Sequence, residues 1–144
     1  MAGDTTGTSI EWLVLADAAQ IVSNKLFLLG GGWDRYTVSQ FPAQMPFAVA
    51  VSLRVPWNET NQQHSFELEV ATQDGQSLVK MGGAFEVGRP PGIPLGSDQR
   101  LQLAMNGSLK LEKAGLYVII GRVEGQEAAR TAFTVVSHSQ PVQR

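Results

Sequence analysis

The segment KLFLLGGGWD, residues 25–34, joins four consecutive apolar residues to three glycines and a tryptophan. The apolar residues 26–29 occupy both alternating sets of positions, a pattern typical of a strand that is covered on both faces. The glycines 30–32 remove every side chain at the end of the strand, which permits positive φ or the close approach of another backbone. We therefore predict that residues 25–34 contain the central strand of a sheet.

The residues upstream predict a partner for this strand. Residues 11–16 contain Trp-Leu-Val-Leu, whose aromatic and β-branched residues favour a strand, although the nearby alanines would also suit a helix. Ser23 and Asn24 then form a turn pair, because Asn tolerates the left-handed conformation that tight hairpins require. We expect an antiparallel hairpin between residues 11–16 and 25–34.

Most of the remaining chain alternates apolar and polar residues. In the segment 47–55, FAVAVSLRV, larger apolar residues occupy every second position, which predicts a strand with one strongly buried face. Glu67 and Glu69 alternate with apolar residues in the next strand, and we expect both at a solvated edge. Further strands are expected within 64–72, 78–87 with a bulge at Gly82-Gly83, 101–111, 114–123 and 128–136.

The short strands and frequent turns predict an all-β fold, an antiparallel immunoglobulin-like, Greek-key β-sandwich of about eight strands. Residues 88–97, GRPPGIPLGS, suit neither a helix nor a central strand and would carry the chain from one sheet to the other. Tyr117 follows a segment that resembles an immunoglobulin tyrosine corner, in which the hydroxyl bonds to nearby backbone. A single closed barrel is the alternative that this pattern leaves open.

The composition narrows the possible functions. The chain has 144 residues, a formal net charge of -2 and no cysteine, so it offers no thiol nucleophile, thiolate metal site or disulfide. Its basic residues are scattered, which argues against nucleic acid or an anionic membrane as a partner. The two histidines, His64 and His138, lack the spacing of a metal site or a catalytic triad. We predict no metal and no cofactor.

The ends of the chain carry no secretory signal pattern, and no segment is long enough to span a bilayer. We therefore predict a cytoplasmic location. We also predict a single domain over residues 9–136, with flexible tails at 1–8 and 137–144.

Aromatic, charged and amide side chains gather in three of the predicted connections. They are Trp33, Asp34 and Arg35 after the glycines, Trp57, Glu59 and Asn61 after the strand 47–55, and Arg89 before two prolines. Our main hypothesis is a non-catalytic module that binds a protein partner or another copy of itself through these connections. The alternatives are a carbohydrate or small-molecule site built on Trp33 and Trp57, and a hydrolytic carboxylate pair of Asp34 and Glu59.

Each of these residues also has a structural interpretation. The two tryptophans could cap the open ends of the sandwich core. Arg89, held between Gly88 and Pro90, could bond to loop carbonyl groups rather than to a partner. The glycines 30–32 lack the following helix and Lys-Ser/Thr pair of a phosphate loop, so we interpret them as a bulge or a close-packing device.

Four stretches of the chain, residues 16–34, 46–61, 85–94 and 114–118, resemble the successive blocks of a family of uncharacterised, mostly cytoplasmic bacterial β-sandwich domains of unknown function. The resemblance rests on an aspartate, Gly-Gly-Trp, Pro-Trp-x-Glu and Gly-Arg-Pro-Pro in this order. It implies a single β-sandwich domain and adds no activity, substrate or cofactor. The matching positions, candidates for a shared site or a shared scaffold, are Asp17, Gly31, Gly32, Trp33, Trp57, Glu59, Asn61, Arg89 and Pro90.

Overall fold

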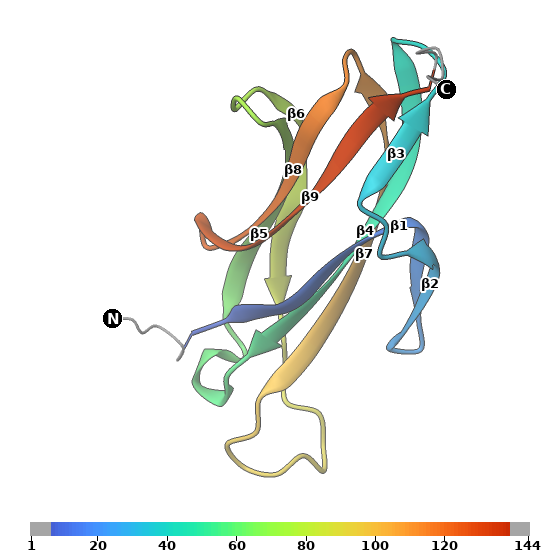
Figure 1. Cartoon of the computed structure of the whole chain (residues 1–144). Helices are drawn as coiled ribbons and strands as arrows, with labels where there is room; N and C mark the ends of the chain where they lie inside the picture. Colours follow the sequence, from blue (N-terminus) through green and yellow to red (C-terminus); the bar gives the residue numbers. More distant parts are fainter. Residues whose placement is uncertain (1–6, 139–144) are drawn as a thin grey trace.

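The computed structural model describes residues 7–138 as two β-sheets packed face to face (Figure 1). The strands are β1 (Ser9–Val22), β2 (Lys25–Gly31), β3 (Arg35–Val38), β4 (Ala43–Val55), β5 (Gln63–Thr72), β6 (Ser77–Glu86), β7 (Gln99–Leu111), β8 (Gly115–Val123) and β9 (Gln126–Ser137), and a short 3-10 helix, η2 (Trp57–Glu59), follows β4. One sheet has the order β2-β1-β4-β7 and the other β3-β9-β8-β5-β6.

This arrangement confirms the predicted all-β, immunoglobulin-like sandwich. The described residues form two sheets with separate edges, so the fold is not the single closed barrel that the sequence pattern also allowed. The described residues form nine strands instead of about eight, because the short β3 was not expected. β3 runs parallel to β9, so the sheets are not wholly antiparallel.

The core lies between the sheets, and β4 supplies much of it. Phe47, Val49 and Val51 point inward and are fully or almost fully buried, as the alternation of residues 47–55 predicted. The opposite face of β4 is also buried, at Ala48 and Ala50, which the sequence did not predict. A further layer must therefore cover the outer face of this strand.

That layer is the β1–β2 hairpin, which bends out of the sheet and crosses its outer face. Ala19 of β1 packs with Ala48 and Ala50. The Asn106 side chain of β7 donates to the Ala19 carbonyl at 2.9 Å and accepts from the Ala19 N–H at 3.3 Å. Gln102 of β7 donates to the carbonyl of Asn24 at the hairpin turn at 2.8 Å. Only small side chains on β4 leave room for a backbone this close.

The position of β2 corrects the prediction made from residues 25–34. β2 is the edge strand of its sheet and not a central strand, and Figure 1 shows it on an arm beside the main body. Phe27, Leu28 and Leu29 are 55%, 39% and 69% exposed. A hairpin with Ser23 and Asn24 in its turn, at φ of 52° and 62°, is confirmed. Its first strand was placed too early, because residues 16–22 pair with β2 whereas residues 12–16 pair with β4. An apolar run alone does not distinguish a covered strand from an exposed apolar edge.

Two details of β5 and β6 also differ from expectation. The pairing continues without a shift at Gly82, and the irregularity lies between Val70 and Ala71. Gly82 is required for another reason, because a Cβ there would lie 2.1 Å from the carbonyl oxygen of Phe66. Glu67 and Glu69 do not lie at an edge, since β5 sits between β8 and β6 and both carboxylates pair with Arg122, at 2.9 and 2.8 Å.

The predicted tyrosine corner is present. The Tyr117 hydroxyl donates to the Lys113 carbonyl at 2.6 Å, and its ring stacks on Phe133 with 5.3 Å between centroids. This contact fixes the entry to β8 against β9.

The predicted tails fall mostly on residues 1–6 and 139–144, which lie outside the described residues. Thr8 was also assigned to a tail, yet its N–H and hydroxyl both donate to the Glu59 carboxylate, at 2.9 and 2.6 Å. β9 likewise extends to Ser137.

Candidate functional site

Arg89 and Trp57 form the best-defined surface cluster near the predicted site residues. Val55 ends β4, and Pro56 leads into η2, which lies in the connection between β4 and β5 at one end of the sandwich (Figure 1). The Arg89 guanidinium carbon lies 3.8 Å from the centroid of the Trp57 ring. Arg89 Nε donates to the Thr60 hydroxyl at 2.6 Å and Nη2 to the Trp57 carbonyl at 2.7 Å. A cation held over a tryptophan face by two hydrogen bonds has a fixed direction.

The segment that carries Arg89 is itself tied to η2. Asn61 adopts a positive φ of 61°, and its N–H donates to the Val87 carbonyl at 2.7 Å. Asn61 therefore positions the chain that leads into Gly88 and Arg89. This confirms that Arg89 bonds to a loop carbonyl, the structural interpretation offered above, while its side chain remains exposed at the surface.

A groove of about 680 Å³ begins beside Arg89. Its walls are the tip of the β1–β2 hairpin, the segment 87–90 and the first residues of β7, and it is lined by Ile21, Asn24, Val87, Gly88, Arg89, Pro90, Gln99, Arg100, Leu101 and Gln102. β7 pairs with β4 on one side only and forms an edge of its sheet. The groove therefore follows a strand edge on which backbone groups lack a strand partner among the described residues.

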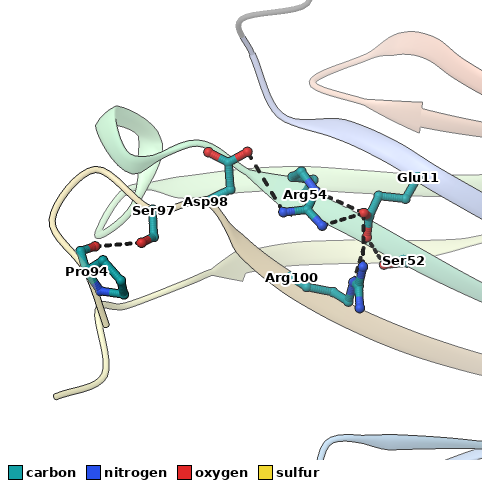
Figure 2. A network of polar contacts seen from close by, with 7 residues as sticks. All are labelled: Glu11, Ser52, Arg54, Pro94, Ser97, Asp98 and Arg100. Atoms are coloured by element: carbon teal, nitrogen blue, oxygen red, sulfur yellow. Dashed lines mark hydrogen bonds and ion pairs between the residues drawn. The ribbon is translucent and has the colours of Figure 1, made fainter. Parts of the chain in front are cut away.

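Arg100, in the wall of this groove, belongs to a network centred on Glu11 (Figure 2). The Glu11 carboxylate accepts hydrogen bonds from Arg100 Nε at 2.7 Å, Ser52 Oγ at 2.6 Å and Arg54 Nη2 at 2.6 Å. The bonds from Arg100 and Ser52, with that from Arg54, lower the pKa of Glu11 to about 2. Asp98 lies 3.9 Å from Arg54.

Several charged side chains gather at this end of the molecule. Three arginines, Arg54, Arg89 and Arg100, lie near two carboxylates, Glu11 and Asp98. Both carboxylates pair with Arg54 or Arg100, whereas no described carboxylate pairs with Arg89. Arg89 is therefore the cation that remains open to an anionic partner.

Glu59 and His64 lie on the other side of η2. The His64 side chain is buried, with Nδ1 2.6 Å from Glu124 Oε2 and Nε2 2.8 Å from the Glu59 carbonyl. Both neighbouring atoms are hydrogen-bond acceptors, an arrangement that favours an imidazole protonated on both nitrogens. Burial lowers the pKa of His64, but the hydrogen bonds to Glu59 and Glu124 outweigh it and raise the pKa above its usual value. The contact of Glu124 with His64 was not predicted, because the position of Glu124 in the sequence is typical of a turn.

Trp33, Asp34 and Arg35 lie elsewhere, at the entry to β3. Trp33 packs against Tyr36 and Phe133, with ring centroids 5.7 and 5.9 Å away. Its indole N–H is buried and has no partner among residues 7–138. The Asp34 carbonyl accepts from Thr134 N–H at 2.9 Å, which fixes this segment to β9.

The predicted site residues thus form two groups. Trp57, Asn61 and Arg89 come together at one end, and Glu59 adjoins them through η2. Trp33, Asp34 and Arg35 belong to the β3–β9 side, and Figure 1 shows β3 far from the connection between β4 and β5. Asp34 and Glu59 make no contact with each other that would pair their carboxylates, and Glu59 is engaged by Thr8.

The fold defines a single immunoglobulin-like β-sandwich with an arginine-lined groove at one end. Residues 11–136 match the family described as "Family of unknown function (DUF6941)", and the chain belongs to this family. None of the curated proteins compared matches the chain.

Two solved structures are similar in outline. One is the Pseudomonas fluorescens alkylpurine DNA glycosylase AlkC bound to DNA containing an abasic site analog, with 10% identity, a TM-score of 0.49 and coverage of 91% of this chain. This chain spans 31% of the glycosylase chain. The other is an immunoglobulin-like protein from Pseudomonas aeruginosa, with 11% identity, a TM-score of 0.35 and coverage of 92% of this chain and 99% of that one.

No described helix is long and apolar enough to cross a membrane. No group of three or more His, Cys, Asp or Glu side chains within residues 7–138 could hold a metal ion.

Proposed function

We propose that this domain is a non-catalytic binding module that contacts a protein partner through the end formed by Trp57, Arg89 and the groove beside β7. The observation that carries the proposal is the fixed position of Arg89 over Trp57. Tryptophan and arginine dominate the binding energy of protein interfaces. A side chain already held in place loses little conformational entropy when a partner binds.

The groove supports an extended polypeptide as the partner. An extended segment can add to a free strand edge through its backbone, while the surrounding side chains select its sequence. β7 offers such an edge, and Pro90, Ile21 and Leu101 supply apolar contacts next to it. The exposed cation of Arg89 favours a segment that carries a carboxylate near this end.

The contacts of the site also support a non-catalytic role. His64 is the histidine nearest to the predicted site, and both of its ring nitrogens are engaged in hydrogen bonds within the protein. It cannot accept a proton from a substrate in this arrangement. A carbohydrate site gains no support, because one face of Trp57 is covered by Arg89 and Trp33 packs against Tyr36 and Phe133.

Selection from a library of random linear peptides displayed on phage would test this function. We expect acidic peptides to be enriched, and we expect Trp57→Ala and Arg89→Ala to lose their binding while the fold, followed by circular dichroism, is retained. Arg130→Ala is the matched control, since Arg130 is an exposed arginine paired only with Glu127 among the described residues. Enriched peptides that bind both site variants as tightly as the wild type would contradict the proposal.

A cytoplasmic location stays a prediction.

A further inference from the structure

A small apolar cleft lies between β6 and β7, which are edge strands of different sheets. The two strands approach each other closely, since a Cβ on Gly107 of β7 would lie 3.5 Å from Met81 Cε of β6. The cleft has a volume of about 290 Å³, and every described residue in its lining is apolar or glycine. Its large side chains are Phe66, Met81, Phe85, Leu103 and Met105.

Gly83 leaves a gap in the wall that β6 contributes. Gly83 pairs with Phe66 of β5, which is buried in the core, so its missing side chain would face the space between the sheets. Met81 and Phe85 share this face, because they lie two positions away on either side. A Cβ on Gly83 would have no described atom within 4 Å apart from its two chain neighbours. The cleft is therefore open where β6 lacks a side chain between Met81 and Phe85.

The opposite wall belongs to a strand with a free edge. Leu103 and Met105 of β7 pair with Val51 and Val49, whose side chains are buried between the sheets, so both face the same interior. On its other side β7 has no strand partner among residues 7–138. An extended segment that added to this edge would point every second side chain into the cleft.

The cleft continues the groove that begins beside Arg89. Residues 99–102 of β7 line the groove and residues 103–105 line the cleft, while the facing walls are formed by residues 87–90 and 81–85. A segment that follows β7 from position 99 to position 105 passes Arg89 first and the cleft second. The centres of the two regions, near positions 100 and 104, are about four residues or about 13 Å apart in an extended chain.

We propose that this cleft binds an apolar side chain of the same extended segment whose carboxylate meets Arg89. The inference rests on the proposed function and adds a second specificity site to it: the bound segment carries an apolar residue about four positions from an acidic one. The size of the cleft supports a single side chain, because pockets for drug-sized ligands measure roughly 300–1,000 Å³. Met81 and Met105 allow the walls to adapt to side chains of different shape.

Gly83→Leu tests the cleft, because the added side chain would fill it without a clash at Cβ. In the phage selection we expect the wild type to enrich peptides with an apolar residue about four positions from an acidic one. Gly83→Leu should reduce the enrichment of the apolar residue at least about tenfold and keep that of the acidic residue, and Gly83→Ala should have a smaller effect. Gln76→Leu is the matched control, because it adds an exposed leucine outside the cleft and leaves the charge unchanged.

The selection separates this inference from the proposed function. An equal apolar preference in Gly83→Leu and the wild type would overturn the cleft site and leave the Arg89 site standing. A wild-type selection that enriches no acidic peptides would overturn both.

Methionine methyl resonances provide a second test that needs no substitution. Met81 and Met105 line the cleft, whereas Met45 is fully buried in the core and serves as the internal reference. In protein labelled with ¹³C at the methionine methyl groups, the strongest selected peptide should shift Met81 and Met105 but not Met45. The same peptide with serine in place of its apolar residue should shift neither. Unshifted Met81 and Met105 in the peptide complex would overturn the proposal, and shifts caused by hexanol but not by the peptide would assign the cleft to a small apolar ligand instead.

Discussion

The buried imidazole of His64 and the half-exposed carboxylate of Glu124 lie 2.6 Å apart and tie the start of β5 to the end of β8. The pKa of His64 is raised, so the stability from its charge is complete below about pH 6.5 and is lost as the pH rises through the higher folded value. The pKa of Glu124 is lowered, mainly by the bond from His64, so its contribution is present above the usual value of 4.5 and is lost as the pH falls through the folded value.

We therefore predict that the free energy of unfolding decreases as the pH rises above about 6.5. Solvent screens the exposed side of Glu124, which limits the decrease to below about 1 kcal/mol. Urea denaturation at several pH values would measure it. Glu124→Gln keeps the shape of the side chain and should flatten the dependence. An equally steep dependence in this variant would show that another group causes it.

Glu11 should govern stability in acid. The folded carboxyl group titrates at about 2 instead of 4.5, so the stability that it provides is complete above about pH 5 and is lost as the pH falls toward 2. We predict that Glu11→Gln destabilises the protein at pH 7 by on the order of 2 kcal/mol, because Arg54 and Arg100 lose their common partner. The difference between variant and wild type should shrink as the pH falls from about 5 toward 2. A constant difference from pH 7 to pH 3 would contradict this assignment.

The hydroxyl of Tyr117 should contribute to stability independently of its ring. Tyr117→Phe removes the hydrogen bond to the Lys113 carbonyl and leaves the stacking on Phe133 in place. We expect a loss of about 1 kcal/mol in the free energy of unfolding. Tyr36→Phe, which alters the other tyrosine in the chain, is the control and should have a smaller effect. Equal losses in the two variants would show that the hydrogen bond of the Tyr117 hydroxyl adds no stability of its own.

The contact between Asn106 and Ala19 should hold the β1–β2 hairpin against its sheet. Asn106→Ala removes both hydrogen bonds to the Ala19 backbone. We predict faster amide hydrogen exchange in residues 17–31 than in the wild type, with exchange in β8 and β9 unchanged. Gln44→Ala is the control, because it removes one exposed hydrogen bond to Ser108 that does not involve the hairpin. Uniformly faster exchange would indicate global destabilisation instead.

Much of the fold could be predicted because the responsible signals are local. Alternation in residues 47–55 identified the buried face of β4, Ser23-Asn24 identified a hairpin turn, and Tyr117 identified the corner. The position of β2 could not be predicted, because an apolar run has the same composition whether a sheet covers it or it lies at an exposed edge. The hairpin that covers β4 depends on contacts such as Asn106 with Ala19, which are 87 residues apart.

The candidate site was predictable only in part. The short polar connections pointed to Trp57, Asn61 and Arg89, which the structure brings together. Trp33 also lies in a short polar connection and was predicted for the same reason. That connection leads to β3, and the parallel pairing of β3 with β9 cannot be recognised from the sequence. Arg100 was missed because its position in the wall of the groove depends on the register of β7 against β4.

Amide chemical shift mapping with the strongest peptide from the phage selection would locate the binding surface on the domain. We predict that the largest shift changes in the ¹⁵N-labelled domain occur in the segment 87–89 and in the first residues of β7, 99–102, and that Arg89→Ala removes them. Changes centred on β3 and β9 around Trp33, with residues 87–89 and 99–102 unaffected, would contradict it.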